Sequence, residues 1–437
     1  MTTDTRTETD RSRIRKIATA ALTASTLEWY DFYVYGTAAA LVFGPLFFSG
    51  LGDAAGTLAA FATFGVGFVF RPVGGLIFGH FGDRLGRKRL LVVAMLMMGV
   101  STFLIGCLPG FAAMGLAAPL LLVFLRAIQG IAVGGQYGGA MLLVTESAPA
   151  HRRGFYGSFA HIGPSLAVIV SNMVFLVVSS AMSPDAFASW GWRIPFLLSA
   201  LVIAAGLFIQ LRIEETDDFQ RLQAHKKAPA SGRPAQQRSP LLTAILTHPK
   251  QILQAGGMIL LVQVYYYTLI VFTISYATSR GMSQSVILTL VLVSSAVTVV
   301  SIPLFAALSD RTGRKKVIVP ATVFSIVSVV PFVMLLQTSQ TVLTLVALII
   351  PGLALGAMYG PMAAFYSEMF STGVRYSGAS TGYQLGAVLG GGFAPLIATA
   401  LFEGTGSLWA VAAYIVVAGV LSLIAVLTAK DNYHPAA

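Results

Sequence analysis

Four charged residues interrupt the apolar parts of this sequence, and they are the residues best suited to do chemistry. Glu28, Asp31, Arg71 and Arg126 each lie within a long apolar stretch. An ionisable side chain inside a membrane is costly and usually marks a functional site. A carboxyl group removed from water binds a proton more readily, and the planar fork of an arginine matches a ligand carboxylate. The four residues therefore indicate proton transfer together with the binding of an anion.

The spacing of these residues predicts that three of them share one level. A helix rises about 1.5 Å per residue, so a helix that begins near residue 17 holds Glu28 and Asp31 on the order of 16–21 Å deep. Arg71 lies at a depth on the order of 18 Å when counted from the polar end of its own stretch. Tyr35 shares a helical face with the two acids. Arg71 could bind a ligand at this level, or it could form a structural ion pair with Asp31 or Glu28.

The composition indicates that helices in a lipid bilayer position these residues. Hydrophobic residues make up 56% of the 437-residue chain and charged residues 10%, whereas about 25% of a soluble domain is charged. A bilayer core needs about 20 residues of helix, and twelve stretches are long and apolar enough to supply it. Their approximate ranges are 17–48, 54–80, 90–108, 117–147, 154–181, 190–212, 251–279, 285–308, 317–337, 341–370, 375–401 and 406–429. The expected fold is an all-α membrane protein with twelve transmembrane helices.

The positions of lysine and arginine predict the orientation in the membrane. With the N-terminus inside, 24 of the 28 lysines and arginines fall in segments on the inner side, and cytoplasmic loops carry such an excess. Both termini are therefore expected in the cytoplasm, and the net charge of +11 does not indicate nucleic acid. The expected parts are an N-terminal tail (1–16), a six-helix bundle (17–212), a charged linker (213–250), a second six-helix bundle (251–430) and a short tail (431–437).

The two bundles repeat each other in sequence. A run of Asp, Arg, any residue, Gly, Arg and Lys begins at Asp83 and again at Asp310. Glycines spaced by four residues follow in 117–147 and again in 341–370, and a glutamate precedes an arginine by seven residues at Glu146 and at Glu368. Parallel repeats of this kind are a known plan of transporters, with the substrate site between the halves. The repeat therefore predicts a transporter.

Several motifs give the chain a family resemblance. The run 79–88 (GHFGDRLGRK) resembles the loop signature of the major facilitator superfamily. The segments 28–32 (EWYDF), 71–75 (RPVGG) and 191–196 (GWRIPF) resemble the metabolite:proton symporter family. The resemblance implies import of a small organic acid with protons by alternating access, the acid being a dicarboxylate, a tricarboxylate or a shikimate-like aromatic acid. The alternative it leaves open is proton-coupled uptake of a zwitterionic osmolyte such as betaine or proline.

The resemblance also implies roles within the stretch 117–147. Arg126 begins a run (RAIQG) similar to a superfamily motif whose arginine takes part in substrate binding or proton coupling. The family often has an acid and a tryptophan between the glycine pairs that follow, whereas this chain has Gln136 and Tyr137. That departure implies that this protein couples protons elsewhere or binds a different substrate. A structural alternative for Arg126 is to brace its helix against the first one.

The expected site residues form three groups. Those expected to bind the substrate are Arg71, Arg126, Tyr35, Gln136, Tyr265, Tyr266, Tyr359, Tyr383 and Gln384. Those expected to couple protons are Asp31, Glu28 and His161. Those expected to gate the cytoplasmic face are Asp83, Arg84, Arg87, Asp310, Arg311, Arg314, Glu146, Arg153, Glu368 and Arg375. Within the last group, Glu146 is expected to pair with Arg153 and Glu368 with Arg375. Interior packing is the alternative for the tyrosines and for His161.

Two other classes of function fit the sequence less well. A membrane enzyme needs a cluster of metal ligands or a nucleophile beside its base, and the six histidines show no such spacing. A channel does not explain the repeated bundles with a linker, which favour alternating access. The expected partners are a small organic anion, protons and the lipid bilayer of a bacterial inner membrane, with no nucleic acid. No catalytic residue, metal or cofactor is expected, the proton gradient supplies the energy, and the monomer is the expected functional unit.

Overall fold

The computed structural model is built of helices, and no strand occurs among the residues that it describes. These are residues 2–85, 87–134, 141, 144–201, 203–204, 245–371 and 374–431. The side chains of 2–13, 79–85, 87–89, 91 and 376 lie outside this description. Four of the expected site residues, Asp83, Arg84, Arg87 and Gln136, therefore lie outside the described residues or have side chains that do.

Nine helices in the described part of the chain are long and apolar enough to cross a bilayer. They are Asp53–Phe78, Ala117–Gly134, Ala150–Ala181, Pro249–Ser279, Gln284–Thr312, Arg314–Leu336, Thr341–Met369, Ser377–Thr405 and Leu408–Thr428. Their outer surfaces carry large apolar side chains such as Leu120 and Val342, which are 68% and 71% exposed. Helices that are apolar on every side are stable only inside a protein core or in lipid. The chain is thus a multi-pass membrane protein.

The first half begins with a long helix. α1 (Thr2–Ala38) continues through the π-helical turn η1 (Ala39–Phe43) into α2 (Gly44–Phe47). It therefore begins within the expected N-terminal tail, since a helix can extend beyond the lipid into water. The elements that follow are η2 (Ser49–Leu51), α3 (Asp53–Val69), α4 (Arg71–Leu85), α5 (Arg87–Cys107), α6 (Phe111–Met114), α7 (Ala117–Gly134), η3 (Ala150–Arg152), α9 (Arg153–Ala181), α10 (Pro184–Ser189), η4 (Gly191–Arg193) and α11 (Ile194–Leu197).

The second half begins in the same way. α15 (Pro249–Tyr267) passes through the π-helical turn η5 (Thr268–Phe272) into α16 (Thr273–Ser279), so the internal repeat extends to the π-helical turn. The remaining elements are α17 (Gln284–Thr312), α18 (Arg314–Leu336), α19 (Thr341–Met369), α20 (Arg375–Gly386), η6 (Ala387–Gly392), α21 (Ala394–Thr405) and α22 (Leu408–Thr428).

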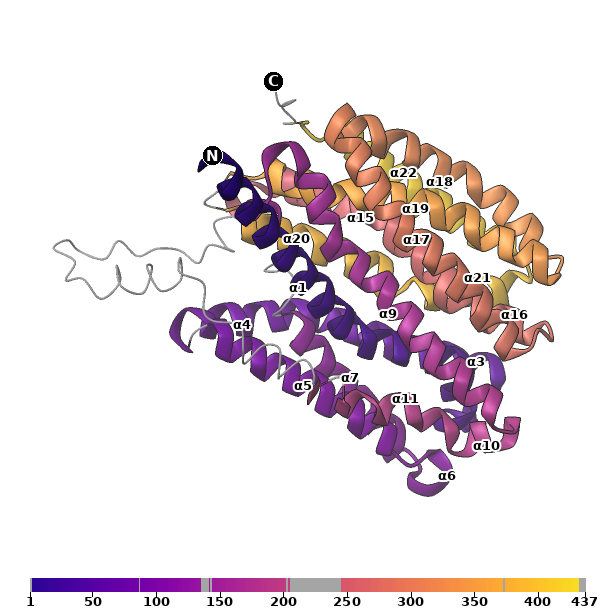
Figure 1. The fold of residues 1–437 in the computed structure, drawn as a ribbon. Coiled ribbons are helices and arrows are strands. Elements are labelled where there is room, and N and C mark those ends of the chain that lie inside the picture. Colours follow the sequence, from indigo (N-terminus) through magenta and orange to yellow (C-terminus); the bar gives the residue numbers. More distant parts are fainter. Residues whose placement is uncertain are drawn as a thin grey trace.

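The two halves pack against each other along two lines. On one, α9 contacts α1 of its own half and α17 and α19 of the other, and Figure 1 shows it between α1 and α17. On the other line, α3 lies against η6. A methyl group on Gly65 of α3 would lie 2.9 Å from the carbonyl oxygen of Gly392, so the two backbones approach closely there. The interface between the halves is therefore formed by helices from both.

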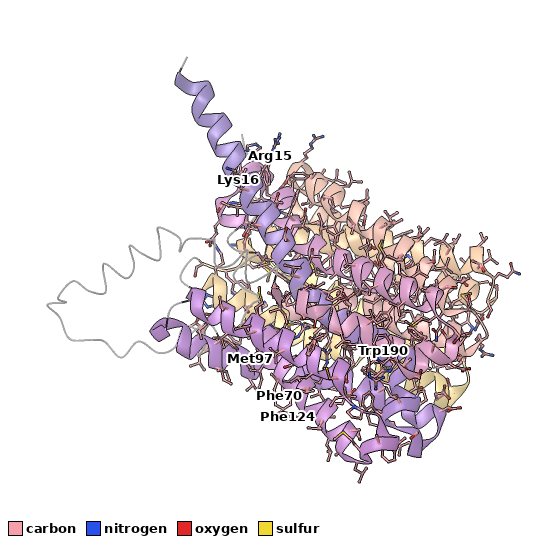
Figure 2. All side chains as sticks on the ribbon, turned by 60° about the horizontal axis from the view of Figure 1, so that its bottom comes forward. Arg15, Lys16, Phe70, Met97, Phe124 and Trp190 are labelled. Atoms are coloured by element: carbon pink, nitrogen blue, oxygen red, sulfur yellow. The ribbon has the colours of Figure 1, made fainter. Side chains whose placement is uncertain are left out.

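One end of the bundle gathers the start of α1, the start of α9 and the end of α22. Ile14 and Ala18 pack with Tyr156, and Lys315 at the start of α18 donates from its Nζ to the Leu427 carbonyl at 2.9 Å. Figure 2 shows α1 leaving the bundle near Arg15 and Lys16. This end is called the charged end below. Its defining residues are Glu146, Asp310, Arg314, Glu368 and Arg375.

Glycines fix the helix pair that carries the first buried arginine. A Cβ atom on Gly74 of α4 would collide with the carbonyl of Ile131 in α7, and one on Gly134 of α7 would collide with the carbonyl of Arg71. Small residues let membrane helices approach to backbone contact. Gly74 and Gly134 therefore let α4 lie directly against α7 beside Arg71.

Candidate functional site

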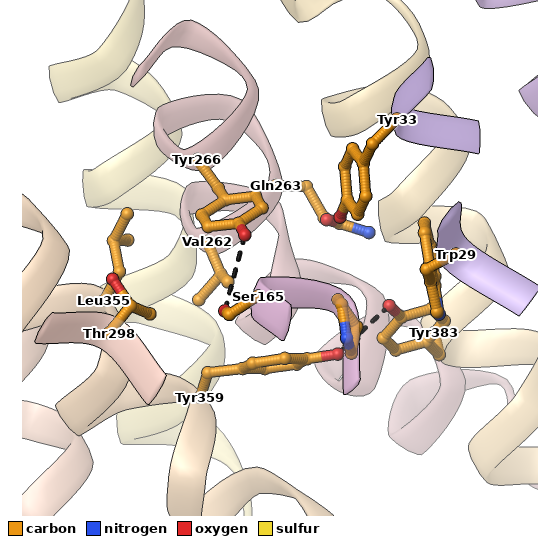
Figure 3. Close-up of a pocket in the computed structure, with 11 residues that line it drawn as sticks. Trp29, Tyr33, Ser165, Val262, Gln263, Tyr266, Thr298, Leu355, Tyr359 and Tyr383 are labelled. Atoms are coloured by element: carbon orange, nitrogen blue, oxygen red, sulfur yellow. Dashed lines mark hydrogen bonds between the residues drawn. The ribbon is translucent and has the colours of Figure 1, made fainter. Parts of the chain in front are cut away.

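A cavity lies between the two halves of the molecule. It is lined by residues from α1 and α9 of the first half and from α15, α17, α19 and α20 of the second (Figure 3). The lining residues are Trp29, Tyr33, Pro164, Ser165, Val262, Gln263, Tyr266, Thr298, Leu355, Tyr359 and Tyr383. None of these residues is charged, and five of them are aromatic. The chemistry of this lining therefore suits a small molecule with an apolar, cyclic or cationic surface.

The cavity includes only some of the residues expected to bind the substrate. Tyr266, Tyr359 and Tyr383 line it. Tyr265 instead directs its hydroxyl toward Ser328, 3.4 Å away. Gln384 is 8% exposed, and neither its amide nitrogen nor its amide oxygen has a partner among the described residues, but it does not belong to the lining.

Eight lining residues were absent from the expected set, and three of them, Pro164, Val262 and Leu355, are apolar; the other five are aromatic or polar. These five are Trp29, Tyr33, Ser165, Gln263 and Thr298. A signal for one of them was present in the sequence, because Gln263 precedes Tyr266 by three residues and residues at that spacing share a helical face. Trp29 and Tyr33 are four residues apart, and their rings stack at 5.6 Å.

Hydrogen bonds engage most of the polar groups around the cavity. The Tyr266 hydroxyl donates to Ser165 Oγ at 3.4 Å. The hydroxyls of Tyr359 and Tyr383 lie 3.3 Å apart. Thr298 Oγ1 donates to backbone carbonyls of α17 and α19. The amide nitrogen of Gln263 has no partner among the described residues.

Arg71 lies behind the aromatic wall of the cavity. Its side chain is 1% exposed, and its Cζ lies 4.0 Å from the centroid of the Phe68 ring, 4.4 Å from that of Phe32 and 4.8 Å from that of Trp29. Arg71 makes no salt bridge with a described residue, so the alternative of an ion pair with Asp31 or Glu28 is not observed. Its Nε and Nη2 have no partner among the described residues. The Trp29 ring thus contacts both the arginine and the cavity.

Arg126 lies close to Arg71 in the first half, since both contact the Phe32 ring. It is fully buried, with its Cζ 3.9 Å from the Phe32 ring centroid and 4.2 Å from that of Tyr35. Its Nη1 donates to Gln129 Oε1 at 2.8 Å, and Gln129 Nε2 donates to Thr102 Oγ1 at 2.7 Å. Arg126 therefore connects α7 to α1 and α5, as in the bracing alternative, and Phe32 lies beside both buried arginines.

The two carboxyl groups of α1 have unused hydrogen-bonding capacity. Asp31 is 4% exposed and its Oδ1 has no partner among the described residues, while its carboxyl group lies beside the Thr102 hydroxyl. Glu28 lies within electrostatic range of Arg71, and its Oε1 also lacks a partner in the described part of the chain. A buried carboxylate without hydrogen bonds is unstable unless it binds a proton. The first half therefore holds two acids suited to take up protons.

His161 joins the two halves at the edge of the cavity. Its Nδ1 lies 2.9 Å from the carbonyl oxygen of Tyr359, and its ring stacks on the Tyr359 ring with centroids 3.9 Å apart. A carbonyl only accepts, so Nδ1 carries the hydrogen. Nε2 has no partner among the described residues.

The charged end is closed by contacts between the halves. The carboxylate of Asp310 accepts hydrogen bonds from the backbone nitrogens of Gly154 and Phe155, each 2.8 Å long, at the start of α9. A carboxylate is stabilised at a helix N-terminus. Arg314 is fully buried and bridges Asp310 at 2.6 Å and Glu368 at 3.1 Å. This set of groups ties the second half to the first.

A second contact at the charged end corrects the expected pairs of charges. Arg375 Nη1 donates to Glu146 Oε1 at 3.2 Å, and Glu368 bonds to Arg314. The pairs Glu146–Arg153 and Glu368–Arg375 were therefore wrong. The sequence repeat suggested pairs that follow the seven-residue spacing, whereas Glu146 pairs with Arg375 across the interface and Glu368 pairs with Arg314 within the second half. Arg311 is exposed and belongs to neither contact.

A bundle of apolar helices with a cavity between its halves and ionisable groups buried beside it defines a membrane transporter rather than an enzyme. The profile of the Major Facilitator Superfamily matches residues 32–391. The chain belongs to this family.

Relatives and solved structures agree with that assignment. The chain is 40% identical to the shikimate transporter of Escherichia coli (strain K12) over 425 residues, which covers 96% of this chain and 95% of that one. It is 34% identical to the glycine betaine/proline/ectoine/pipecolic acid transporter of Dickeya dadantii (strain 3937). That match covers 97% of this chain and 84% of the relative. The crystal structure of a D-xylose-proton symporter has the same fold, with a TM-score of 0.74, 17% identity and coverage of 97% and 99%.

Proposed function

We propose that this protein is a secondary active transporter that imports a small organic acid together with protons. The observation that carries the proposal is the position of Arg71, which is separated from an aromatic cavity by a single ring and lies in the same half as the buried Asp31 and the half-buried Glu28. The aromatic walls suit a cyclic acid such as shikimate, after which the 40%-identical relative is named. The cation beside them suits its carboxylate.

The proposed arrangement in the membrane has twelve spanning helices in two bundles of six. It adds three spans to the nine found in the described residues. Both termini and the linker at 213–250 face the cytoplasm, because lysine and arginine gather on that side. The charged end is then the cytoplasmic face. The protein works as a monomer in the inner membrane of a bacterium.

The proposed coupling step links the substrate to the acids of α1. A substrate carboxylate draws the Arg71 or Arg126 guanidinium toward the cavity and away from Glu28 and Asp31. An acid that loses its neighbouring positive charge binds a proton more readily. When the site holds both substrate and proton, its net charge is zero. The change that opens the site to the other side of the membrane then costs less free energy. His161, whose Nε2 is free among the described residues, is a further candidate to receive the proton.

The proposed gate is the charged end. While the contacts of Asp310 with the start of α9 and of Arg375 with Glu146 hold, the cytoplasmic side stays closed. Asp83, Arg84, Arg87 and Arg153 are proposed to complete this gate. Rocking of one half against the other breaks these contacts and opens the inner side.

A second function is favoured by a separate observation. The cavity has aromatic rings and no charged lining residue among those described, and aromatic cages bind quaternary ammonium groups. A zwitterionic osmolyte of the kind named for the 34%-identical relative fits such a cage. In that case Arg71 neutralises the acids of α1 and does not contact the substrate.

Uptake by proteoliposomes separates the two functions. Purified protein is reconstituted with an inward proton gradient, and labelled shikimate and glycine betaine are supplied in turn. The organic-acid proposal expects accumulation of shikimate that stops when a protonophore is added. Accumulation of betaine without shikimate supports the second function, and no gradient-driven accumulation of either compound contradicts both.

A further inference from the structure

Gln263 differs from the other polar side chains of the cavity because its hydrogen-bonding group is unused. The residue is 5% exposed, and its Nε2 has no partner among the described residues. Most other polar groups of the lining are engaged. They are Ser165 and Tyr266, Tyr359 and Tyr383, and Thr298.

A buried amide without a partner is unfavourable unless something else satisfies it. The loss of hydrogen bonds to water on burial is not recovered by a bond to any described residue. Nearly all such groups in native proteins are satisfied by protein, water or ligand. A donor that is free among the described residues, in a cavity between the two halves, is therefore available to contact a transported molecule.

The base of the Gln263 side chain is held in place by the second half. A methyl group on Gly390 of η6 would lie 2.9 Å from Gln263 Cβ, so α15 and η6 are in close contact at this point. Figure 3 shows the amide of Gln263 next to Tyr33 of α1. The donor therefore belongs to one half while the aromatic surface beside it belongs to the other.

The chemistry of the lining restricts what this donor can bind. An amide N–H donates to an oxygen and cannot attract a cation. The rings of Trp29, Tyr33 and Tyr266 pack against an apolar or cationic body and leave its oxygen atoms to be bound elsewhere. A carboxylate is the oxygen-bearing group that an organic acid and a zwitterionic osmolyte share.

We propose that Gln263 is the specificity-determining residue that recognises the carboxylate of the substrate. Its Nε2 donates to a carboxylate oxygen while the aromatic rings hold the rest of the molecule. Arg71, behind Trp29, then neutralises the carboxylate without direct contact in the closed state. The inference rests on the proposed transport function, but it holds for either of the two substrate classes.

The test compares three substitutions with a control on the same helix. Gln263→Leu removes the donor, Gln263→Asn shortens it, and Gln263→Glu replaces it with an acceptor. Gln254→Leu is the control, because Gln254 lies on α15 outside the cavity and bonds to Thr428 Oγ1 at 3.3 Å. Each protein is checked for a single gel-filtration peak and for its melting temperature, then reconstituted and supplied with shikimate, with glycine betaine and with the methyl ester of each.

For the compound that the wild type transports, we expect Gln263→Leu to raise KM by roughly tenfold or more with Vmax within about threefold. The preference for the acid over its ester should fall by a similar factor. Gln263→Asn should retain part of the preference for the acid. Gln263→Glu should lose more of this preference than the leucine variant, since its carboxylate repels the substrate carboxylate. Gln254→Leu should keep the wild-type KM and preference.

Two outcomes would overturn the inference, and they differ from failure of the proposed function. A folded Gln263→Leu protein with wild-type KM and preference shows that the amide does not recognise the carboxylate. An equal rise in KM for acid and ester shows a role in cavity shape alone. If the wild type moves neither shikimate nor glycine betaine, the proposed function fails, whatever the variants do.

Discussion

The two halves of this transporter share a repeat but differ in the chemistry they bring to the centre. The first half buries Arg71, Arg126 and Asp31 and half-buries Glu28. The second half contributes tyrosines, a threonine and an amide. The two halves therefore share a scaffold, whereas the arginine behind the aromatic wall of the cavity belongs to the first half. This difference suggests that the first half couples protons and the second recognises the substrate.

The largest effect should come from removing the cation nearest the cavity. Arg71→Leu leaves the acids of α1 and the substrate carboxylate without their closest positive charge. Loss of one partner from a buried charge arrangement weakens binding by roughly 30-fold or more. We therefore expect initial uptake rates at low substrate to fall by that factor.

Arg71→Lys is the matched variant for that measurement. Lysine keeps the charge but lacks the planar group that stacks on Phe68 and Phe32, so uptake should fall less than in the leucine variant. Wild-type uptake by folded Arg71→Leu would show that the first half does not need this charge, and the contrast between the halves would fail.

The next effect concerns the charged end, where the second copy of the repeated loop motif supplies Asp310 and Arg314. Arg314→Leu leaves Asp310 and Glu368 without their shared cation in a buried site. Breaking such a site costs about 3–5 kcal/mol, so the melting temperature of the detergent-solubilised protein should fall clearly. Arg311→Leu, an exposed position in the same loop motif, should change stability by less than about 0.5 kcal/mol. Equal melting temperatures for the two variants would remove the proposed role of Arg314.

The smallest effect is expected at the outer edge of the same gate. Glu146 is 55% exposed in its salt bridge with Arg375, and exposed pairs contribute about 0–1 kcal/mol. Glu146→Gln should therefore change the uptake rate by less than about fivefold and make it less sensitive to salt. The control is Glu403→Gln, which alters an exposed acid of α21 away from the charged end. A complete loss of uptake in Glu146→Gln would mean that this pair, and not Asp310, holds the gate closed.

Much of the fold could be predicted because hydropathy and the positions of lysine and arginine are patterns that extend over long segments. The repeated glycines and the membrane family followed from local sequence. The start of α1 could not be predicted in this way, because polar residues mark the edge of the lipid and not the end of a helix. The helix begins at Thr2 rather than near residue 17.

The site was less accessible to sequence reasoning. Buried charges are visible as exceptions in apolar stretches, so Arg71, Arg126 and Asp31 could be selected. A tyrosine in such a stretch has no comparable signal, and only the packing of helices separates Tyr266 in the cavity from Tyr265 against α18. The partner of Glu146 depended on how the halves close, and that of Glu368 on the packing of α18 against α19; no local pattern contains either.

The central claim is that Asp31, an acid of the first half, carries the proton, and Asp31→Asn tests it most directly. Asparagine keeps the shape of the side chain but does not bind or release the proton. In proteoliposomes, the variant should lose accumulation driven by a pH gradient while it still exchanges labelled for unlabelled substrate at a rate within about threefold of wild type. Accumulation equal to that of the wild type would show that Asp31 is not the coupling group and would contradict the account.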